Sequence, residues 1–188
     1  MKSITNDTIS RFIPIINNTT TLDDNPIFPT VIVVLKGKGV SSLGPIHQRE
    51  ATKNDIPEIV AFDELCFGAS RRKLLEPLLL DSSNLCYVSK EKRSLQGFVV
   101  TKVYQEGAEV GPLVCREGCV DVAIDLLKAV LNRLEGLEVV MCVPEKELRI
   151  RDTLMRGGFR EDFRIAQMFY GAPVSRDCIY IAESLERG

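Results

Sequence analysis

Three strand-like runs in succession, between Asn84 and Cys115, constrain the fold more than any other feature of the sequence. The segment NLCYVSKEKRSLQGFVVTKVYQEGAEVGPLVC alternates apolar and polar residues, and the short polar stretches KEKRS and QEGA interrupt the alternation. Alternation of this kind predicts β-strands, and the two interruptions predict hairpin turns. Three consecutive antiparallel strands argue against a doubly wound nucleotide-binding domain, in which strands and helices alternate along the chain.

Segments with helical periodicity and further apolar runs surround these strands. One helix is expected to begin near Asn54 or Asp55, with Pro57 in its first turn, and to end at Gly68. Its apolar stripe, expected to be buried, consists of Ile56, Ile59, Val60, Phe62 and Leu65. A second, shorter helix is expected to break near Pro77. In chain order, the expected strands and helices cover residues 46–52, 53–68, 70–83, 84–115, 120–134, 137–144, 145–159, 163–171 and 178–185. This order predicts an α/β (α+β) domain with a mixed, mostly antiparallel sheet and helices on both faces.

Residues 1–45 differ from the rest of the chain and predict an N-terminal arm. The arm contains the polar, turn-rich run NNTTTLDDNP, the strand-like run TVIVVL, and the segment KGKG, which we interpret as part of a flexible linker. It is expected either to be partly flexible or to add one or two strands to the domain formed by residues 46–188. Because the arm lies outside the regular pattern, we expect the domain to fold without it.

Charge and hydropathy exclude several classes of function. The 188 residues carry a net charge of −2, with Lys and Arg interspersed among Asp and Glu, so no nucleic-acid partner is expected. The apolar runs have the length of strands, well below the roughly 18 residues of a membrane helix, so no membrane partner is expected. The single histidine, His47, lacks a cluster of other ligands, and no metal site is expected.

The cysteines indicate a reducing compartment. The N-terminus has no uninterrupted apolar core of the kind that opens a secretory signal. Most of the cysteines lie in apolar, strand-like segments, where a free thiol behaves as a small hydrophobic group. We therefore expect reduced, structural cysteines in a cytoplasmic protein. They are Cys66, Cys86, Cys115, Cys119, Cys142 and Cys178.

Several short stretches, taken in their order, resemble the GNAT superfamily of acyl-CoA-dependent N-acyltransferases. These stretches are REATKNDIPEI, LQGFVV, VGPLVCREGCVDVAIDLLKAVL and VPEKELRIRDTLMRGGF. In addition, FDELCFGASRRKLL and GPLVC are similar to a narrower branch of the superfamily. In that branch a G-x-x-R-x-x-L-L stretch follows the first helix, and Gly-Pro opens the cofactor strand. The resemblance covers residues 46–188 and implies the same fold as the pattern of strands and helices.

The resemblance implies an acyl-CoA site where GPLVCREGCV leads into the following helix. The pantetheine arm of acyl-CoA would pair with the edge of the strand, as an added peptide strand does. Its pyrophosphate would lie at the free backbone N–H groups of the loop, the positive end of the helix and the Arg116 side chain. The implied cofactor-binding residues are Leu113, Val114, Cys115, Arg116, Gly118, Cys119, Val120, Asp121 and Glu147.

The same segments depart from the family pattern at several positions. The small residues of the loop are spaced differently, since Val120 falls on the second small position. Glu117 and Asp121 add negative charge, which is unfavourable beside a phosphate unless both side chains point outward. In the last helix, Glu147 and Leu154 stand where the family commonly has asparagine and tyrosine. These departures keep open a GNAT fold with a weakened or lost cofactor site.

Acyl transfer to an amine needs a base, because only the neutral amine attacks. The resemblance places Glu109 on the strand that carries a carboxylate base in some family members, and Tyr170 is the expected acid. The alternatives are a solvated strand position for Glu109 and a core position for Tyr170. Arg71 and Arg72 follow the turn GAS and are candidates for binding an anionic substrate or a phosphate. The alternative to ligand binding is that both arginines simply lie on the surface of a helix.

The function implied is transfer of an acetyl group from acetyl-CoA to an amine, carried by a small molecule or a peptide. Transfer in this family is direct, so Cys115 and Cys119 are not expected to act as nucleophiles, and no metal is expected. The alternative is a GNAT-fold domain that has lost catalysis and binds an acyl-CoA or regulates another activity. Both functions are compatible with a homodimer.

Overall fold

The computed structural model describes residues 29–40, 48–168 and 177–183. In these ranges the strands form one sheet in the order β2-β3-β4-β5-β6-β1-β7, and β8 pairs with β5 outside this order. The strands are β1 (Pro29–Lys38), β2 (Arg49–Glu50), β3 (Leu85–Glu91), β4 (Ser94–Val103), β5 (Gly107–Cys115), β6 (Glu138–Pro144), β7 (Arg160–Met168) and β8 (Ile179–Ile181). The helices are α1 (Ile56–Phe67), α2 (Arg72–Leu80), α3 (Val120–Arg133) and α4 (Leu148–Arg156), and a 3-10 turn, η2 (Lys53–Asp55), precedes α1.

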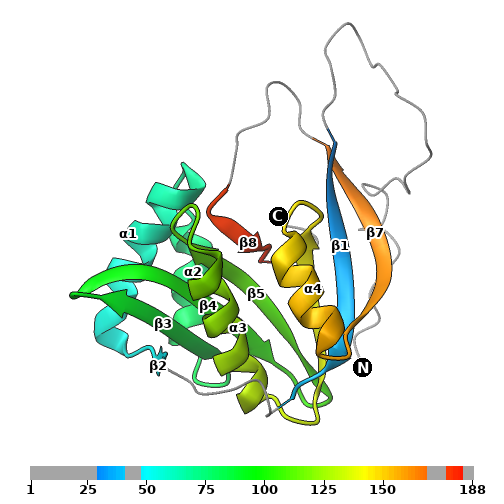
Figure 1. Ribbon diagram of the computed structural model, residues 1–188. Helices are drawn as coiled ribbons and strands as arrows, with labels where there is room; N and C mark the ends of the chain where they lie inside the picture. Colours follow the sequence, from blue (N-terminus) through cyan, green and yellow to red (C-terminus); the bar gives the residue numbers. More distant parts are fainter. Residues whose placement is uncertain (1–28, 41–47, 169–176, 184–188) are drawn as a thin grey trace, which may run out of the picture.

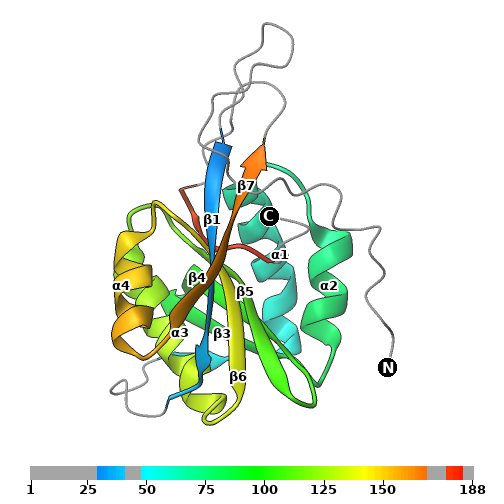
Figure 2. The ribbon, with the colours of Figure 1, turned by 90° about the vertical axis from the view of Figure 1, so that its right-hand side faces the viewer.

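Helices cover both faces of the sheet. α1 and α2 lie on one face, and α3 and α4 lie on the other (Figure 1 and Figure 2). From β2 onward the order of strands and helices is the one predicted from the sequence, so the mixed, mostly antiparallel α/β fold is confirmed. The only parallel pair of strands in the described ranges joins β5 to β6. None of the described helices is long and apolar enough to cross a bilayer.

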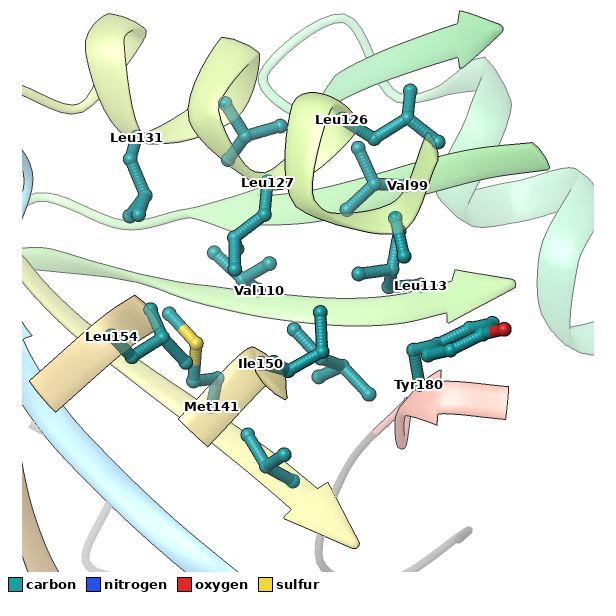
Figure 3. Packing of buried hydrophobic residues seen from close by; sticks show 14 of the residues in the cluster. Val99, Val110, Leu113, Leu126, Leu127, Leu131, Met141, Ile150, Leu154 and Tyr180 are labelled. Atoms are coloured by element: carbon teal, nitrogen blue, oxygen red, sulfur yellow. The ribbon is translucent and has the colours of Figure 1, made fainter. Parts of the chain in front are cut away.

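The larger hydrophobic core lies between the sheet and the helix pair α3 and α4. The spacing of Leu126, Leu127 and Leu131 places all three on the buried side of α3. Ile150 and Leu154 likewise lie on the buried side of α4 (Figure 3). Burial of a side chain of this size contributes about 1.5–3 kcal/mol. This core therefore holds α3 firmly on the sheet, with its first turn close behind the end of β5.

The first helix pair differs from the expectation at two positions. α1 ends at Gly68 as predicted, and the φ of 78° at this residue is one that favours glycine. Leu65, expected in the buried stripe of α1, is 74% exposed. α2 continues through Pro77 instead of breaking there, at the cost of one backbone hydrogen bond.

The strand-like run TVIVVL is a central part of the sheet. β1 pairs antiparallel with β6 on one side and with β7 on the other. Val33 and Leu35 on one face of β1 and Val34 on the other are buried, so both faces of the strand are covered. The residues before 46 therefore add a strand to the sheet, which is the second of the two expectations for the arm. Residues 1–28 of the expected arm lie outside the described residues.

The segment KGKG is not a flexible linker. Gly37 belongs to β1, and a Cβ atom at this position would come within 2.6 Å of the Phe159 ring. Gly39 follows the strand, and a Cβ atom there would lie 2.0 Å from the carbonyl oxygen of Leu134. The glycines allow close packing of the chain at both positions. The linker interpretation was therefore wrong.

The position of β1 predicts a large loss of stability when its core is truncated. Leu35→Ala should lower the free energy of unfolding by about 2–5 kcal/mol, since it opens a cavity in the core. Leu65→Ala, the same change on an exposed site, should alter it by less than about 0.5 kcal/mol. Denaturant unfolding measures both values. Equal stability of the two variants would contradict the assignment of β1 to the core.

Candidate active site

β5 parts from β6 about halfway along its length. The parallel ladder runs from Gly107 opposite Glu138 to Val110 opposite Met141. Pro112 follows shortly after, and it has no N–H to donate to a neighbouring strand. The rest of β5 is not paired with β6. This is the strand edge to which the sequence resemblance assigns a pantetheine arm.

The turn after β5 presents backbone N–H groups at the start of α3. The N–H of Cys119 donates to the carbonyl oxygen of Arg116 at 3.0 Å, and Gly118 adopts a φ of 76°. α3 begins at Val120, and no side chain in the described ranges caps it. The first N–H groups of such a helix lack intrahelical partners and carry partial positive charge. The turn therefore fits an anionic group such as a pyrophosphate.

Charged side chains near this turn do not block it. Asp121 is 82% exposed in its side chain and forms an ion pair of 2.7 Å with Arg149 of α4, which balances its charge. The Arg116 guanidinium donates to the Ser94 hydroxyl at 3.3 Å and lies 5.8 Å from the centre of the Phe62 ring. Arg116 thus extends between β4 and α1. Arg149, which the sequence analysis did not single out, is the cation joined to the first turn of α3.

Glu147 lies at the same end of the domain as the turn. It is the N-cap residue of α4, two positions before Arg149. Burial raises the pKa of its carboxyl group, and Asp177 adds to this effect while Lys146 opposes it. The ion pair of Arg149 with Asp121 links this end of α4 to the start of α3, so Glu147 lies near the turn, with no hydrogen bond or ion pair to it in the described ranges.

Past Pro112, the edge of β5 that has lost β6 as a partner is occupied by β8. β8 pairs antiparallel with β5, with Leu113 opposite Ile181, and it lies between β5 and α4 in Figure 1. The N–H of Cys115 donates to the carbonyl oxygen of Cys178 at 3.0 Å. Leu113, Val114 and Cys115 are consequently buried by the chain itself. The turn fits a pyrophosphate, whereas the strand edge does not fit a pantetheine arm while β8 is in place.

Glu109, the expected base, belongs to a compact charged cluster. The Lys102 ammonium lies 2.8 Å from Glu109 Oε2 and 3.0 Å from Glu183 Oε1. The Tyr104 hydroxyl donates to the same Glu109 oxygen at 3.4 Å. Burial alone would lower the pKa of Lys102, but its hydrogen bonds to Glu109 and Glu183 raise it, so the ammonium stays charged. Both contacts fall on Oε2, so a substrate proton would have to reach the carboxylate at Oε1.

Lys102 and Glu183 were not predicted as site residues from the sequence. The signal for Lys102 was present, because a hairpin that turns at QEGA places Lys102 opposite Glu109 on the neighbouring strand. Glu183 had no comparable signal. It follows the apolar run CIYIA near the end of the chain, where a charged residue predicts a solvated position, yet it is buried.

Residues 59–180 match the acetyltransferase (GNAT) domain family. The chain belongs to this family. The match includes the helices on both faces of the sheet, the turn at Arg116 and the strand pair that parts at Pro112. No curated protein is similar enough in sequence to count as a match.

Solved structures share the fold at low sequence identity. A predicted acetyltransferase from Pyrococcus horikoshii is 17% identical, with a TM-score of 0.63, and the alignment covers 95% of this chain and 54% of that one. An acetyltransferase of the GNAT family from Colwellia psychrerythraea is 15% identical, with a TM-score of 0.58, and the alignment covers 77% of this chain and 58% of that one. The GNAT domain thus spans a little over half the length of these two proteins.

The two arginines after the turn GAS have different environments in the GNAT domain. Arg71 is buried, and it donates to both carboxylate oxygens of Asp63, at 3.0 and 2.6 Å, while its guanidinium stacks on Phe67. Arg72 is exposed and pairs only loosely with Glu76, at 3.6 Å. Arg71 is therefore committed to the packing of α1 against α2. Tyr170, the expected acid, lies outside the described residues.

The cysteines of the GNAT domain are free thiols. Burial raises the pKa of the Cys115 thiol well above its ordinary value, so this side chain is a poor nucleophile. Burial likewise raises the pKa of the Cys142 thiol to about 12. No group of cysteine, histidine and acidic side chains in the described ranges is arranged to hold a metal ion.

Replacement of the two neighbouring arginines separates a structural role from a ligand-binding role. Arg71→Met should lower the free energy of unfolding by about 3–5 kcal/mol, because it leaves the buried Asp63 carboxylate without its cation. Arg72→Met, with the same change in charge on an exposed site, should cost less than about 0.5 kcal/mol. Thermal or denaturant unfolding of both variants measures the difference. A stable Arg71→Met variant would show that Arg71 is free for a ligand.

Proposed function

We propose that this GNAT domain is an acyl-CoA-dependent N-acyltransferase that transfers an acetyl group to an amine of a small molecule or a peptide. The observation that carries the proposal is the uncapped start of α3, which follows the strand that parts from β6. A helix start of this kind binds phosphate groups through backbone N–H groups and the helix dipole. The Arg149 side chain offsets the negative charge of Asp121 at the same turn.

Glu109 is the proposed base. It lies on β5 just before Gly111 and Pro112, and so close to the point where the acyl group would have to lie. Its carboxylate would accept the proton that an ammonium ion must lose before the nitrogen attacks. The Lys102 ammonium next to it is a fixed positive charge, and it sets the orientation of the Glu109 carboxylate.

One observation favours a second function, a GNAT-fold domain without catalysis. In the structure, the candidate base is paired with Lys102 and the candidate pantetheine edge is paired with β8. A domain without catalysis would not need a free base, and one that regulates another activity without binding an acyl-CoA would need neither group to be free. Binding and turnover measurements on the same preparation distinguish the two functions.

Titration calorimetry with acetyl-CoA tests the donor site. Arg116→Glu should weaken binding by at least about fivefold, because it reverses a charge beside a polyanion. Arg133→Glu reverses the same charge in the last turn of α3, away from the proposed site, and should leave the affinity unchanged. Equal effects of the two variants would show that the turn does not hold the donor.

Thiol release with a panel of amines tests the chemistry. Glu109→Gln keeps the shape of the side chain and removes the proton acceptor, so turnover at neutral pH should fall by about 100- to 10,000-fold. Part of the loss should return at higher pH, where more of the amine is neutral. Glu138→Gln, which removes an exposed ion pair with Lys36, is the matched control. Full turnover in Glu109→Gln would exclude Glu109 as the base, and binding of acetyl-CoA without turnover in the wild type would favour the second function.

A further inference from the structure

We infer that β8 is a self-inhibitory strand, which competes with the pantetheine arm of acyl-CoA for the same edge of β5. The inference rests on the proposed donor site and adds a regulation of that site. Pantetheine can pair with a strand edge only through the backbone groups that the edge leaves free. In this domain those groups are bonded to residues of the same chain.

β8 is bonded to both strands that part from each other. On the β5 side, the N–H of Cys115 donates to the carbonyl oxygen of Cys178 at 3.0 Å. On the β6 side, the N–H of Ala182 donates to the carbonyl oxygen of Cys142 at 2.9 Å. β8 thus spans the space between the ends of β5 and β6. An extended ligand arm would need the same position and the same kind of hydrogen bond.

The chain after β8 lies directly against the point where β5 parts from β6. A Cβ atom on Gly111 would lie 2.0 Å from the carbonyl oxygen of Ala182. The φ of 154° at Gly111 is also one that side chains rarely adopt. A residue other than glycine at position 111 would therefore push the segment away. Glycine at position 111 therefore lets β8 and the chain after it pack against β5.

Apolar packing and one buried ion pair hold β8. Tyr180 and Ile181 are buried in the core beneath α3 and α4, and Figure 3 shows Tyr180 beside Leu113. The Tyr180 hydroxyl donates to the carbonyl oxygen of Arg116 at 3.4 Å, so β8 also contacts the turn that would hold the pyrophosphate. The buried Glu183 carboxylate is held by Lys102.

The attachment of β8 is also incomplete, which suits a strand that has to leave. β8 has only three residues in strand conformation. Glu183 Oε2 is buried and has no hydrogen-bond partner in the described ranges. A buried oxygen without a partner is destabilising, and release of the segment to solvent removes that cost. Competition then lowers the apparent affinity for acyl-CoA in proportion to the small fraction of molecules whose β5 edge is free.

Hydrogen exchange on the full chain tests the competition directly. Coenzyme A should speed exchange of the backbone amides in residues 177–183, because its pantetheine arm displaces β8. The nucleotide part alone, 3′-phospho-ADP, should leave their exchange unchanged, because it has no pantetheine arm. Unchanged or slower exchange of these amides in the presence of bound coenzyme A would overturn the inference and leave the proposed donor site intact.

A pair of isoleucine variants tests the same point by affinity. Ile181→Ala weakens the packing of β8, so it should tighten binding of coenzyme A at least about tenfold. Ile59→Ala makes the same change at a fully buried position of α1, in the core on the other face of the sheet from Ile181, and should leave the affinity unchanged. Equal or weaker binding by Ile181→Ala would overturn the inference. Failure of both the wild type and Ile181→Ala to bind coenzyme A would overturn the inference and the proposed function together. If Ile181→Ala does not fold, hydrogen exchange on the wild type decides.

Discussion

Backbone hydrogen bonding along β5 is the constraint on which the rest of the domain depends. The first half of β5 is paired with β4 on one side and β6 on the other. The second half is buried but has lost β6 as a partner, and buried N–H and C=O groups rarely remain unpaired. Something extended must therefore lie along this edge. In the isolated chain it is β8, and in the proposed complex it is the donor, so the donor site and the C-terminal strand cannot be considered separately.

The cluster around Lys102 links this edge to the proposed chemistry. Lys102 lies on β4, Glu109 on β5 and Glu183 directly behind β8, so one ammonium group joins three segments. When β8 is in place, two carboxylates share that ammonium. Departure of β8 would leave Lys102 to Glu109 alone and would strengthen the hold on the candidate base. Binding of the donor and the ion pairing of Glu109 are therefore connected through the Lys102 side chain.

The fold was largely predictable, and the site was predictable only in part. Alternation and hairpin turns predicted the three antiparallel strands β3, β4 and β5. Small residues followed by a helical apolar stripe predicted the turn at Gly118 and α3. Both signals are local in the sequence. The central place of TVIVVL in the sheet and the packing of KGKG were not predicted, because the partners of β1 lie at the other end of the chain. The same limitation hid the pairing of β8 with β5 and the burial of Glu183. A strand that replaces a ligand has the same apolar pattern as any other buried strand.

The place of β1 in the sheet also has a consequence for how the chain folds. Ile32 pairs with Pro144 and with Ile165, so a strand made early in synthesis has to wait for partners made much later. Contacts between residues so distant in sequence slow folding, since a long loop must close before they form. During this interval the apolar face of β1 is exposed. The step most sensitive to aggregation is therefore expected before the last third of the chain has joined the sheet.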